Sequence, residues 1–220
     1  MKLDYQKCIA FWNGVFSEED SGAPKATTSG NTALDEAIEW LCNGTNRVLD
    51  FGCGNGAMLF LCALAGTRDH VGIDLSQEAV LCAGRKADHM PIGAYQFEQG
   101  GVESLSKYPK ESFDAVILSN IIDNLYPEDA RLILNESARV LKNGGKALIK
   151  LNPYLAQEQI AAWDIKEIAG NLLDDGLLLW NNTTEEWRDL FTPYFTIYRE
   201  EEIYYPEYEQ TNRLFCLVKA

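Results

Sequence analysis

The sequence predicts an α/β fold: a doubly wound, mostly parallel sheet that carries helices on both faces and ends in an antiparallel β-hairpin. Two observations predict it. Between residues 47 and 151, apolar runs typical of buried strands alternate with segments whose apolar residues recur at helical spacing. Near the end of the chain, two long strand-like segments share a short connection, so they must pair antiparallel. At 220 residues the chain is expected to form one domain, residues 1–220.

Local signals predict each element in chain order. The first 43 residues are expected to form a helix over 1–16, a polar loop over 17–31 and a second helix that Asn31 caps and Asn43-Gly44 ends. Strands are expected at 47–51, 70–74, 94–98, 113–118 and 146–151. Helices are expected between them at 56–65, 76–88 and 127–142, the last one beginning at Pro127 and stopped by Gly144-Gly145. A capping box at Thr183–Glu186 opens a helix to about 191, and strands at 195–205 and 211–219 form the hairpin.

A glycine-rich turn follows the first predicted strand. Residues 48–56 read V-L-D-F-G-C-G-N-G, and Asp74 ends the next strand twenty residues after Gly54. Glycines allow positive φ and remove the Cβ atoms that would block a ligand. The helix that follows offers free N–H groups, and an acid that ends the next strand can accept both hydroxyls of a ribose. The pattern therefore predicts a site for an adenosine-containing cofactor.

Two kinds of cofactor fit this turn. Gly52-x-Gly54-x-x-Ala57, followed by Asp74, matches a dinucleotide-binding fingerprint. Asp50 lies two residues before the first glycine of that fingerprint. A carboxylate there would repel a pyrophosphate but would suit an ammonium or sulfonium group. Asp50 therefore favours a cationic cofactor over a dinucleotide.

The same turn resembles a motif of a known family. Asp50, Gly52, Gly54 and Gly56 match D-x-G-x-G-x-G, the first motif of class I S-adenosylmethionine-dependent methyltransferases. The resemblance covers residues 44–150 and 183–220 and implies a Rossmann-like fold, with S-adenosylmethionine as cofactor and S-adenosylhomocysteine as product. It divides the chain into an N-terminal cap region (1–43), a cofactor-binding core (44–151), a variable insertion (152–182) and a C-terminal helix with the β-hairpin (183–220).

The resemblance also implies roles for individual residues. The glycines would bring their backbone against the methionine part of the cofactor, and Asp50 would orient its ammonium group. Asp74 would accept the two ribose hydroxyls. The adenine would lie against Leu75 and accept a hydrogen bond from the backbone of Val102. The complete set of implied cofactor-binding residues is Asp50, Gly52, Gly54, Gly56, Asp74, Leu75, Val102 and Asn120, the last through its backbone.

Three features depart from the family pattern or stand apart from it. Gly101 lies where many members carry an acid that binds the adenine amino group, and Glu103 follows two residues later. Asp123-Asn124 lies where many small-molecule methyltransferases carry a histidine pair. Asp123 is therefore the candidate catalytic residue, as a general base or as a group that holds an amine nucleophile, with loop capping as the alternative. Leu151-Asn-Pro-Tyr154 is similar to the N-P-P-Y motif of adenine-amino DNA methyltransferases, but it follows the fifth strand and we interpret it as coincidence.

Charge and composition narrow the expected partners. The chain has 19 basic and 33 acidic residues, a net charge of −14. A nucleic-acid-binding surface needs clustered basic residues, so no nucleic-acid partner is expected. The cysteines show no zinc-binding spacing, and no metal is expected. The sequence shows no apolar span and no signal peptide, which predicts a cytoplasmic protein that does not bind a membrane. The oligomeric state is not indicated.

These observations predict an enzyme that transfers a methyl group from S-adenosylmethionine to a small-molecule acceptor by in-line displacement. Aromatic residues gather at the start and in the last third of the chain, where family members cover the substrate cleft, so a cationic or aromatic acceptor is expected. Two alternatives stay open. One is an oxidoreductase that uses an NAD-type dinucleotide, and the other is a protein that binds S-adenosylmethionine without catalysis.

Overall fold

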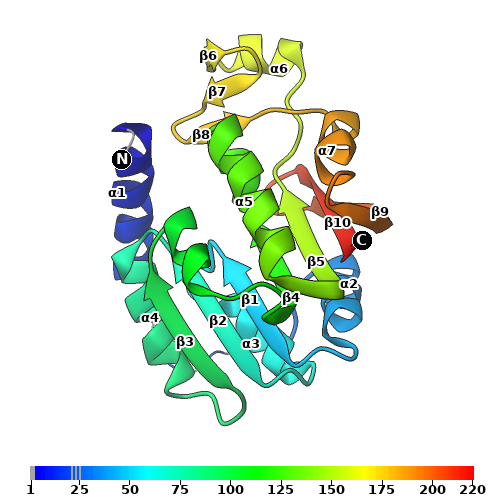
Figure 1. The fold of residues 1–220 in the computed structure, drawn as a ribbon. Coiled ribbons are helices and arrows are strands. Elements are labelled where there is room, and N and C mark those ends of the chain that lie inside the picture. The colour runs from blue at the N-terminus through cyan, green and yellow to red at the C-terminus, as the bar shows by residue number, and fades with distance from the viewer. Residues whose placement is uncertain (1–2, 21, 23, 25) are drawn as a thin grey trace.

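The computed structural model describes residues 3–20, 22, 24 and 26–220, and it is built on one large mixed sheet (Figure 1). Within these residues the sheet has seven strands in the order β3-β2-β1-β4-β5-β10-β9. The first five strands of the chain pair in parallel, and the C-terminal β-hairpin pairs antiparallel with β5. The predicted doubly wound sheet that ends in an antiparallel hairpin is therefore confirmed.

The elements of the fold have the following bounds. The strands of the sheet are β1 (Arg47–Phe51), β2 (Asp69–Asp74), β3 (Ala94–Gln99), β4 (Phe113–Ser119), β5 (Leu141–Leu151), β9 (Phe195–Tyr205) and β10 (Gln210–Lys219). The α-helices are α1 (Leu3–Ser17), α2 (Thr32–Cys42), α3 (Ala57–Leu64), α4 (Gln77–Ala87), α5 (Pro127–Val140), α6 (Gln157–Ala162) and α7 (Thr184–Phe191). Two short 3₁₀ turns are η1 (Val102–Lys107) and η2 (Ile122–Asn124).

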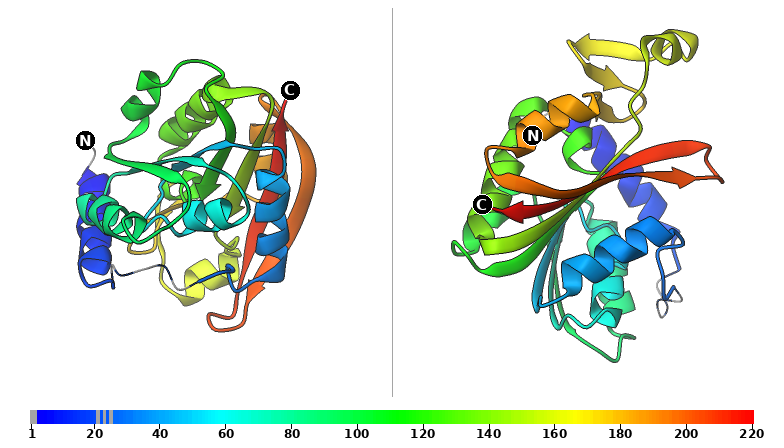
Figure 2. Two further views of the ribbon diagram at one scale, coloured as in Figure 1. Left: turned by 90° about the horizontal axis from the view of Figure 1, so that it is seen from below. Right: turned by 90° about the vertical axis from the view of Figure 1, so that its right-hand side faces the viewer.

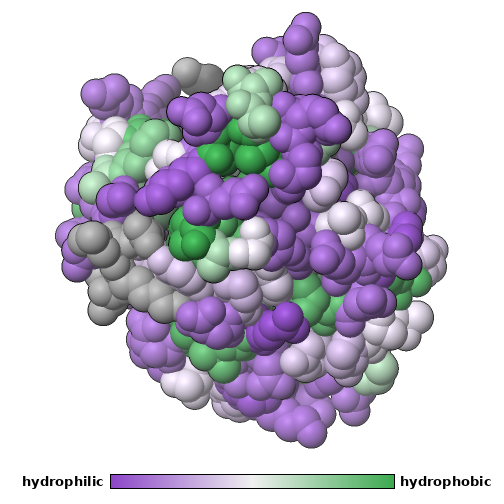
Figure 3. Space-filling model, turned by 90° about the horizontal axis from the view of Figure 1, so that it is seen from above, coloured by the Kyte–Doolittle hydropathy of each residue, from purple (hydrophilic) through white to green (hydrophobic). Residues whose placement is uncertain are grey.

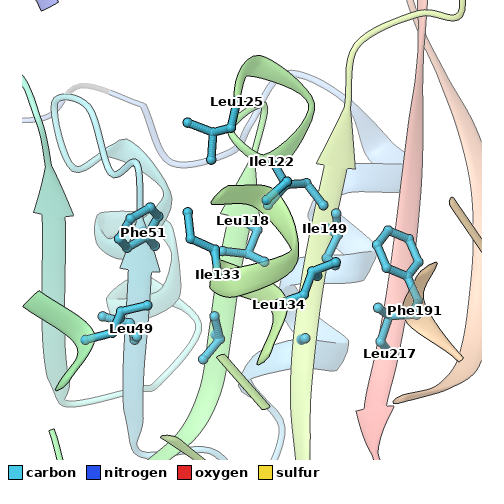
Figure 4. Packing of buried hydrophobic residues seen from close by; sticks show 14 of the residues in the cluster. Leu49, Phe51, Leu118, Ile122, Leu125, Ile133, Leu134, Ile149, Phe191 and Leu217 are labelled. Atoms are coloured by element: carbon cyan, nitrogen blue, oxygen red, sulfur yellow. The ribbon is translucent and has the colours of Figure 1, made fainter. Parts of the chain in front are cut away.

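Two apolar cores hold helices against the two faces of the sheet (Figure 2, right). Successive residues of a strand point to opposite faces, so Leu49 packs on the side of α5 and α7 whereas Val48 packs on the side of α2 and α3. Figure 4 shows the first core, in which Ile133 and Leu134 of α5 lie over the central strands. Helices therefore cover both faces of the sheet, and the ends of its strands are left uncovered.

Helix starts follow the predicted local signals. The side chain of Asn31 accepts hydrogen bonds from two backbone N–H groups of α2, and Ser76 caps α4 in the same way. Thr183 and Glu186 form the predicted capping box of α7. Each side chain satisfies backbone donors that the helix cannot satisfy itself.

Two predicted boundaries are wrong. Helix α5 ends at Val140 rather than at residue 142, because Leu141 already pairs with Phe113 at the start of β5. The register between β4 and β5 then shifts around Gly144, whose φ is 71°, so the glycine pair bulges a strand instead of ending a helix.

The insertion at 152–182 has more regular structure than the sequence indicated. After α6 it forms a small antiparallel sheet of β6 (Lys166–Ala169), β7 (Leu172–Asp174) and β8 (Leu178–Trp180). A separate apolar core supports it, made of Leu155, Ile160, Ile165, Leu173 and Leu179. Figure 1 shows this unit above the carboxyl ends of the central strands, where it can wall a site. None of the helices that the structure describes is both long and apolar enough to cross a membrane.

Candidate active site

A cavity of about 650 Å³ lies at the carboxyl ends of β1, β2 and β4. Open α/β sheets bind ligands at the carboxyl ends of their strands. Figure 3 views the molecule from above and shows hydrophobic patches enclosed by hydrophilic residues. Of the predicted site residues, those that line the cavity are Gly52, Gly54, Asp74, Leu75, Val102 and Asn120.

The glycine turn forms the floor of this cavity. Gly52 and Gly54 have φ values of 80° and 52°, and both line the cavity. A Cβ at Gly52 would lie 2.9 Å from Ile121, and one at Gly54 would lie 3.1 Å from Phe16. Gly56 is different, because it caps α3 at φ 81° and its Cβ position faces the rings of Phe60 and Phe97. The structure thus gives Gly56 a role in the turn and does not place it on the cavity wall.

Asp74 is held rigidly at the cavity by two backbone donors. Its Oδ2 accepts a hydrogen bond from the N–H of Gly54 at 2.9 Å, and its Oδ1 accepts one from the N–H of Ser76 at 2.8 Å. Burial raises the pKa of Asp74, and these two bonds lower it. Each oxygen keeps a further lone pair, so the carboxylate can also accept ribose hydroxyls.

Asp50 does not line the cavity; it precedes Phe51, which does, and it is a buried acid without a full set of partners. It is 1% exposed, and its Oδ1 has no hydrogen-bond partner among the described residues. Burial, followed by the nearby charge of Asp74, raises the pKa of Asp50 to about 8. A buried carboxyl group with an unsatisfied oxygen fits a site that a cation or an ordered water completes.

Glu103 compensates for the glycine at position 101. The N–H of Gly101 donates to Glu103 Oε1 at 2.9 Å, and a Cβ on Gly101 would lie 2.7 Å from Glu103 Oε2. Both residues line the cavity beside Val102. The carboxylate of residue 103 therefore occupies the space that a side chain at 101 would fill, which the sequence analysis did not anticipate.

Helix α1 covers the cavity. Asn13 accepts a hydrogen bond from Ser76 Oγ at 2.7 Å, and the hydroxyl of Tyr5 donates to Asp129 at 2.6 Å. These contacts tie α1 to the chain before α4 and to α5. The cap region was expected to cover the substrate cleft, but α1 also covers the cofactor cavity, since Trp12 and Phe16 line it.

A second cavity of about 900 Å³ adjoins the first. Its walls come from the end of β5, from the 152–182 insertion and from the β9–β10 hairpin. Four residues line both cavities and define their junction: Trp12, Asn120, Asn124 and Leu177. Sequence reasoning missed Asn152 and Arg213 of the second cavity. The signal available for Asn152 was its place after a central strand, in the segment interpreted as coincidence.

The structure does not bring Asp123 into either cavity. Asp123 is fully buried, and its Oδ2 accepts hydrogen bonds from the backbone N–H of Asn152 at 2.6 Å and from its side-chain amide at 3.1 Å. Burial raises the pKa of Asp123. These contacts assign Asp123 to anchoring the turn after β4, in agreement with the loop-capping alternative rather than with a general base. Neither His70 nor His89 lines either of these two cavities.

Comparisons with known proteins bear on this geometry. Residues 49–149 match the family model described as a methyltransferase domain. The uncharacterized methyltransferase YcgJ of Bacillus subtilis is 28% identical over 151 residues, which are 69% of this chain and 57% of that protein. The chain carries a class I S-adenosylmethionine-dependent methyltransferase domain. The predicted methyltransferase family and its cofactor, S-adenosylmethionine, are confirmed. The alternative, an oxidoreductase that uses an NAD-type dinucleotide, is not confirmed.

Solved structures share the fold of this methyltransferase domain. A methyltransferase of Methanosarcina mazei superposes with a TM-score of 0.68 at 21% identity, covering 80% of this chain and 92% of that one. The 1,6-didemethyltoxoflavin-N1-methyltransferase of Burkholderia thailandensis, solved with 1,6-didemethyltoxoflavin and S-adenosylhomocysteine, gives a TM-score of 0.67 at 17% identity, covering 100% and 92%.

The relatives of this methyltransferase domain have diverse acceptors by name. A ribosomal protein L11 methyltransferase of Desulforapulum autotrophicum is 31% identical over 63% of this chain. A human tRNA N(3)-cytidine methyltransferase is 26% identical over 68% of it. The chain spans 42% of the length of each of these two proteins and about half the length of the curated relatives it matches. The family therefore leaves the acceptor class open.

Proposed function

We propose that this methyltransferase transfers the methyl group of S-adenosylmethionine to a small molecule. The observation that carries the proposal is the pair of adjoining cavities, one at the glycine turn and one walled by the insertion and the hairpin. A volume of about 900 Å³ is within the range of small-molecule pockets. A methyl acceptor in the second cavity would meet the cofactor at the shared junction.

Charge on the second cavity supports a small acceptor over a nucleic acid. Asp175, Glu202 and Glu209 line it, and the guanidinium of Arg213 is occupied by backbone carbonyls. The last 70 residues contain 13 acids and 5 bases, a balance of −8. A phosphate polymer would be repelled from such a surface. The expectation of a small, uncharged or cationic acceptor rests on this balance.

The residues present fit the cofactor. When bound, S-adenosylmethionine supplies a methyl group on a positively charged sulfur. Asp50 would balance the charge of its ammonium group, and Asp74 would accept the ribose hydroxyls. Leu75 and Val102 would hold the adenine, and Glu103 would accept from the adenine amino group. The protein would mainly align the reactants and exclude water, which the α1 roof favours.

A transfer assay tests this function directly. The full chain is incubated with S-adenosylmethionine that carries a CD₃ group, together with pools of amines, phenols and thiols, a tRNA mixture and ribosomal protein L11. Mass spectrometry then detects the transferred label. Label in a small-molecule pool is expected, and labelling confined to tRNA or protein would overturn the small-molecule assignment. Calorimetric binding of S-adenosylhomocysteine without any transfer would favour the non-catalytic alternative.

A further inference from the structure

The side chain of Asn120 ends in an unused hydrogen-bond acceptor at the junction of the two cavities. Its Oδ1 is buried and has no partner among the described residues, although the residue lines both cavities. Its backbone has a φ of 53°, a conformation that few non-glycine residues adopt. A buried oxygen without a partner, on a residue that lines a cavity, indicates a site that a ligand or an ordered water completes.

Hydrogen bonds fix which way this amide points. Asp123 Oδ2 accepts the backbone N–H of Asn152, and the side-chain Nδ2 of Asn152 donates to the same oxygen. The Oδ1 of Asn152 is thereby turned to Asn120, whose Nδ2 donates to it at 2.5 Å. The other end of the Asn120 amide, its Oδ1, then points away from these hydrogen bonds. The orientation follows from partners that cannot exchange roles.

A second anchor leads to the same orientation. Asn124 donates from its Nδ2 to the carbonyl of Leu178 at 2.7 Å, which leaves its Oδ1 as an acceptor. That Oδ1 accepts a hydrogen bond from Asn152 Nδ2 at 3.0 Å. The NH₂ group of Asn152 therefore faces Asn124 and Asp123, and its Oδ1 faces Asn120. Arg213 fixes the backbone at the same place, since it donates twice to the carbonyl of Asn152.

We infer that the methyl acceptor of this enzyme is a nitrogen that bears an N–H, and that Asn120 Oδ1 accepts this hydrogen to aim the nitrogen lone pair at the methyl group. The inference rests on the proposed function. The lone pair forms the new bond to the methyl carbon, and the carbon–sulfur bond breaks with its electron pair on sulfur. The proton of the nitrogen then passes to water.

The composition of the junction favours nitrogen over oxygen. The four residues that line both cavities are a tryptophan, a leucine and two asparagines, so no acid or histidine is shared. A hydroxyl nucleophile needs a base that removes its proton as it reacts. The lone pair of a neutral amine is a stronger nucleophile than that of a neutral hydroxyl and can react before the proton leaves, so a non-basic amide suffices to orient it.

Aromatic walls indicate a planar acceptor. Trp12, Tyr154 and Trp163 line the second cavity, with 40%, 43% and 59% of their surface exposed. Partly exposed rings around one cavity provide faces on which a flat ring can stack. The acceptor class is therefore an aromatic amine.

Three probes of one scaffold test the inference. They are 5-aminoindane, 5-indanol and N,N-dimethyl-5-aminoindane, titrated by calorimetry into protein saturated with S-adenosylhomocysteine. The amine is expected to bind about tenfold more tightly than its dimethyl analogue, which lacks the hydrogen. With CD₃-labelled cofactor, the amine and not the indanol should receive the label. No preference for the N–H, including no binding, would overturn the inference.

Variants separate the role of the amide from a structural one. Asn120→Gly keeps the positive φ and removes the amide, so the preference for the amine should vanish while the affinity for S-adenosylhomocysteine changes less than about twofold. Thr211→Ala alters the second cavity away from the junction and should keep the preference. A preference that survives in N120G would contradict the assignment of Asn120. Label on oxygen, sulfur or carbon would overturn it too but would leave the proposed function intact, whereas a failure to bind cofactor would refute both.

Discussion

The two halves of the site are built in different ways. The cofactor half consists of short segments, 50–56, 74–76 and 101–103, in which backbone groups and adjacent side chains make the contacts. The acceptor half depends on Asn120 and Asn152, which lie 32 residues apart and meet only in the folded protein. Contacts made by the backbone at strand ends produce a recognisable motif in the sequence, whereas a network of side chains from distant segments produces none.

The halves also differ in charge. Asp50 is a buried acid and Asp74 a partly buried one, and burial raises the pKa of both. The nearby charge of Asp74 raises the pKa of Asp50 further. The junction, by contrast, presents only neutral amides and apolar groups. A bound cation would favour the ionised form of such acids, so the cofactor half is expected to respond to pH and to charge substitutions. The acceptor half is expected to respond to shape and to hydrogen bonding.

The largest expected effect tests the backbone character of the cofactor half. Gly54→Val should reduce the affinity for S-adenosylhomocysteine by more than about 100-fold, because a β-branched side chain resists positive φ and fills the cavity. Its Cβ would lie 3.1 Å from Phe16. Calorimetry measures the affinity, and circular dichroism checks that the variant is folded.

Gly44→Val is the matched control for this variant. Gly44 also has a positive φ, 74°, but a Cβ there would meet nothing within 4 Å. It should lose stability and keep its affinity. Equal losses of affinity in both variants would mean that backbone strain, and not the cavity, explains the effect.

The next effect concerns a single side chain of the cofactor half. Asp74→Ala should weaken cofactor binding by roughly 1.5–3 kcal/mol, the range for hydrogen bonds to a charged group. The control is Asp69→Ala, at the other end of β2, where the carboxylate pairs with Arg47 at the surface. Calorimetry that shows unchanged affinity in D74A would remove Asp74 from the site.

A third prediction uses the pKa of Asp50, which burial and Asp74 raise to about 8. A bound ammonium group favours the ionised carboxylate, so binding should release a proton below pH 8. Affinity for S-adenosylhomocysteine should then rise by up to about tenfold per pH unit between pH 6 and 7.5. Asp50→Asn should flatten this dependence. Heats of binding that do not vary with the buffer would show that no proton is released.

The same group predicts how the stability of the ligand-free protein depends on pH. The pKa of Asp50 is higher in the folded state than its usual value, so ionisation favours unfolding. Its contribution to stability is complete below pH 4 and is lost as the pH rises toward 8. Asp50→Asn should therefore stabilise the ligand-free protein at pH 8 by about 1–3 kcal/mol. Thermal melts at pH 5 and pH 8 measure the difference.

The sequence predicts the cofactor half far better than the acceptor half. The five parallel strands and the glycine turn follow from apolar periodicity and local spacing, which are properties of short segments. The two alternatives for Asp123 could not be separated from the sequence, because its hydrogen bonds to Asn152 join distant segments. The sheet β6-β7-β8 was missed because its strands are only three or four residues long, too short to show a period.

The smallest expected effect tests the aromatic wall of the acceptor half. Trp163 lines the second cavity only and is 59% exposed, so Trp163→Ala removes a stacking face without touching the cofactor cavity. Affinity for 5-aminoindane should fall about 2- to 10-fold, in keeping with an aromatic contact of about 0.5–1.5 kcal/mol. Tyr198→Ala is the matched control, because Tyr198 is 64% exposed, stacks on Trp40 and lines neither cavity. If W163A also weakened S-adenosylhomocysteine binding, the two halves would be coupled through the insertion. The separation between a backbone-built cofactor site and a side-chain-built acceptor site would then have to be abandoned.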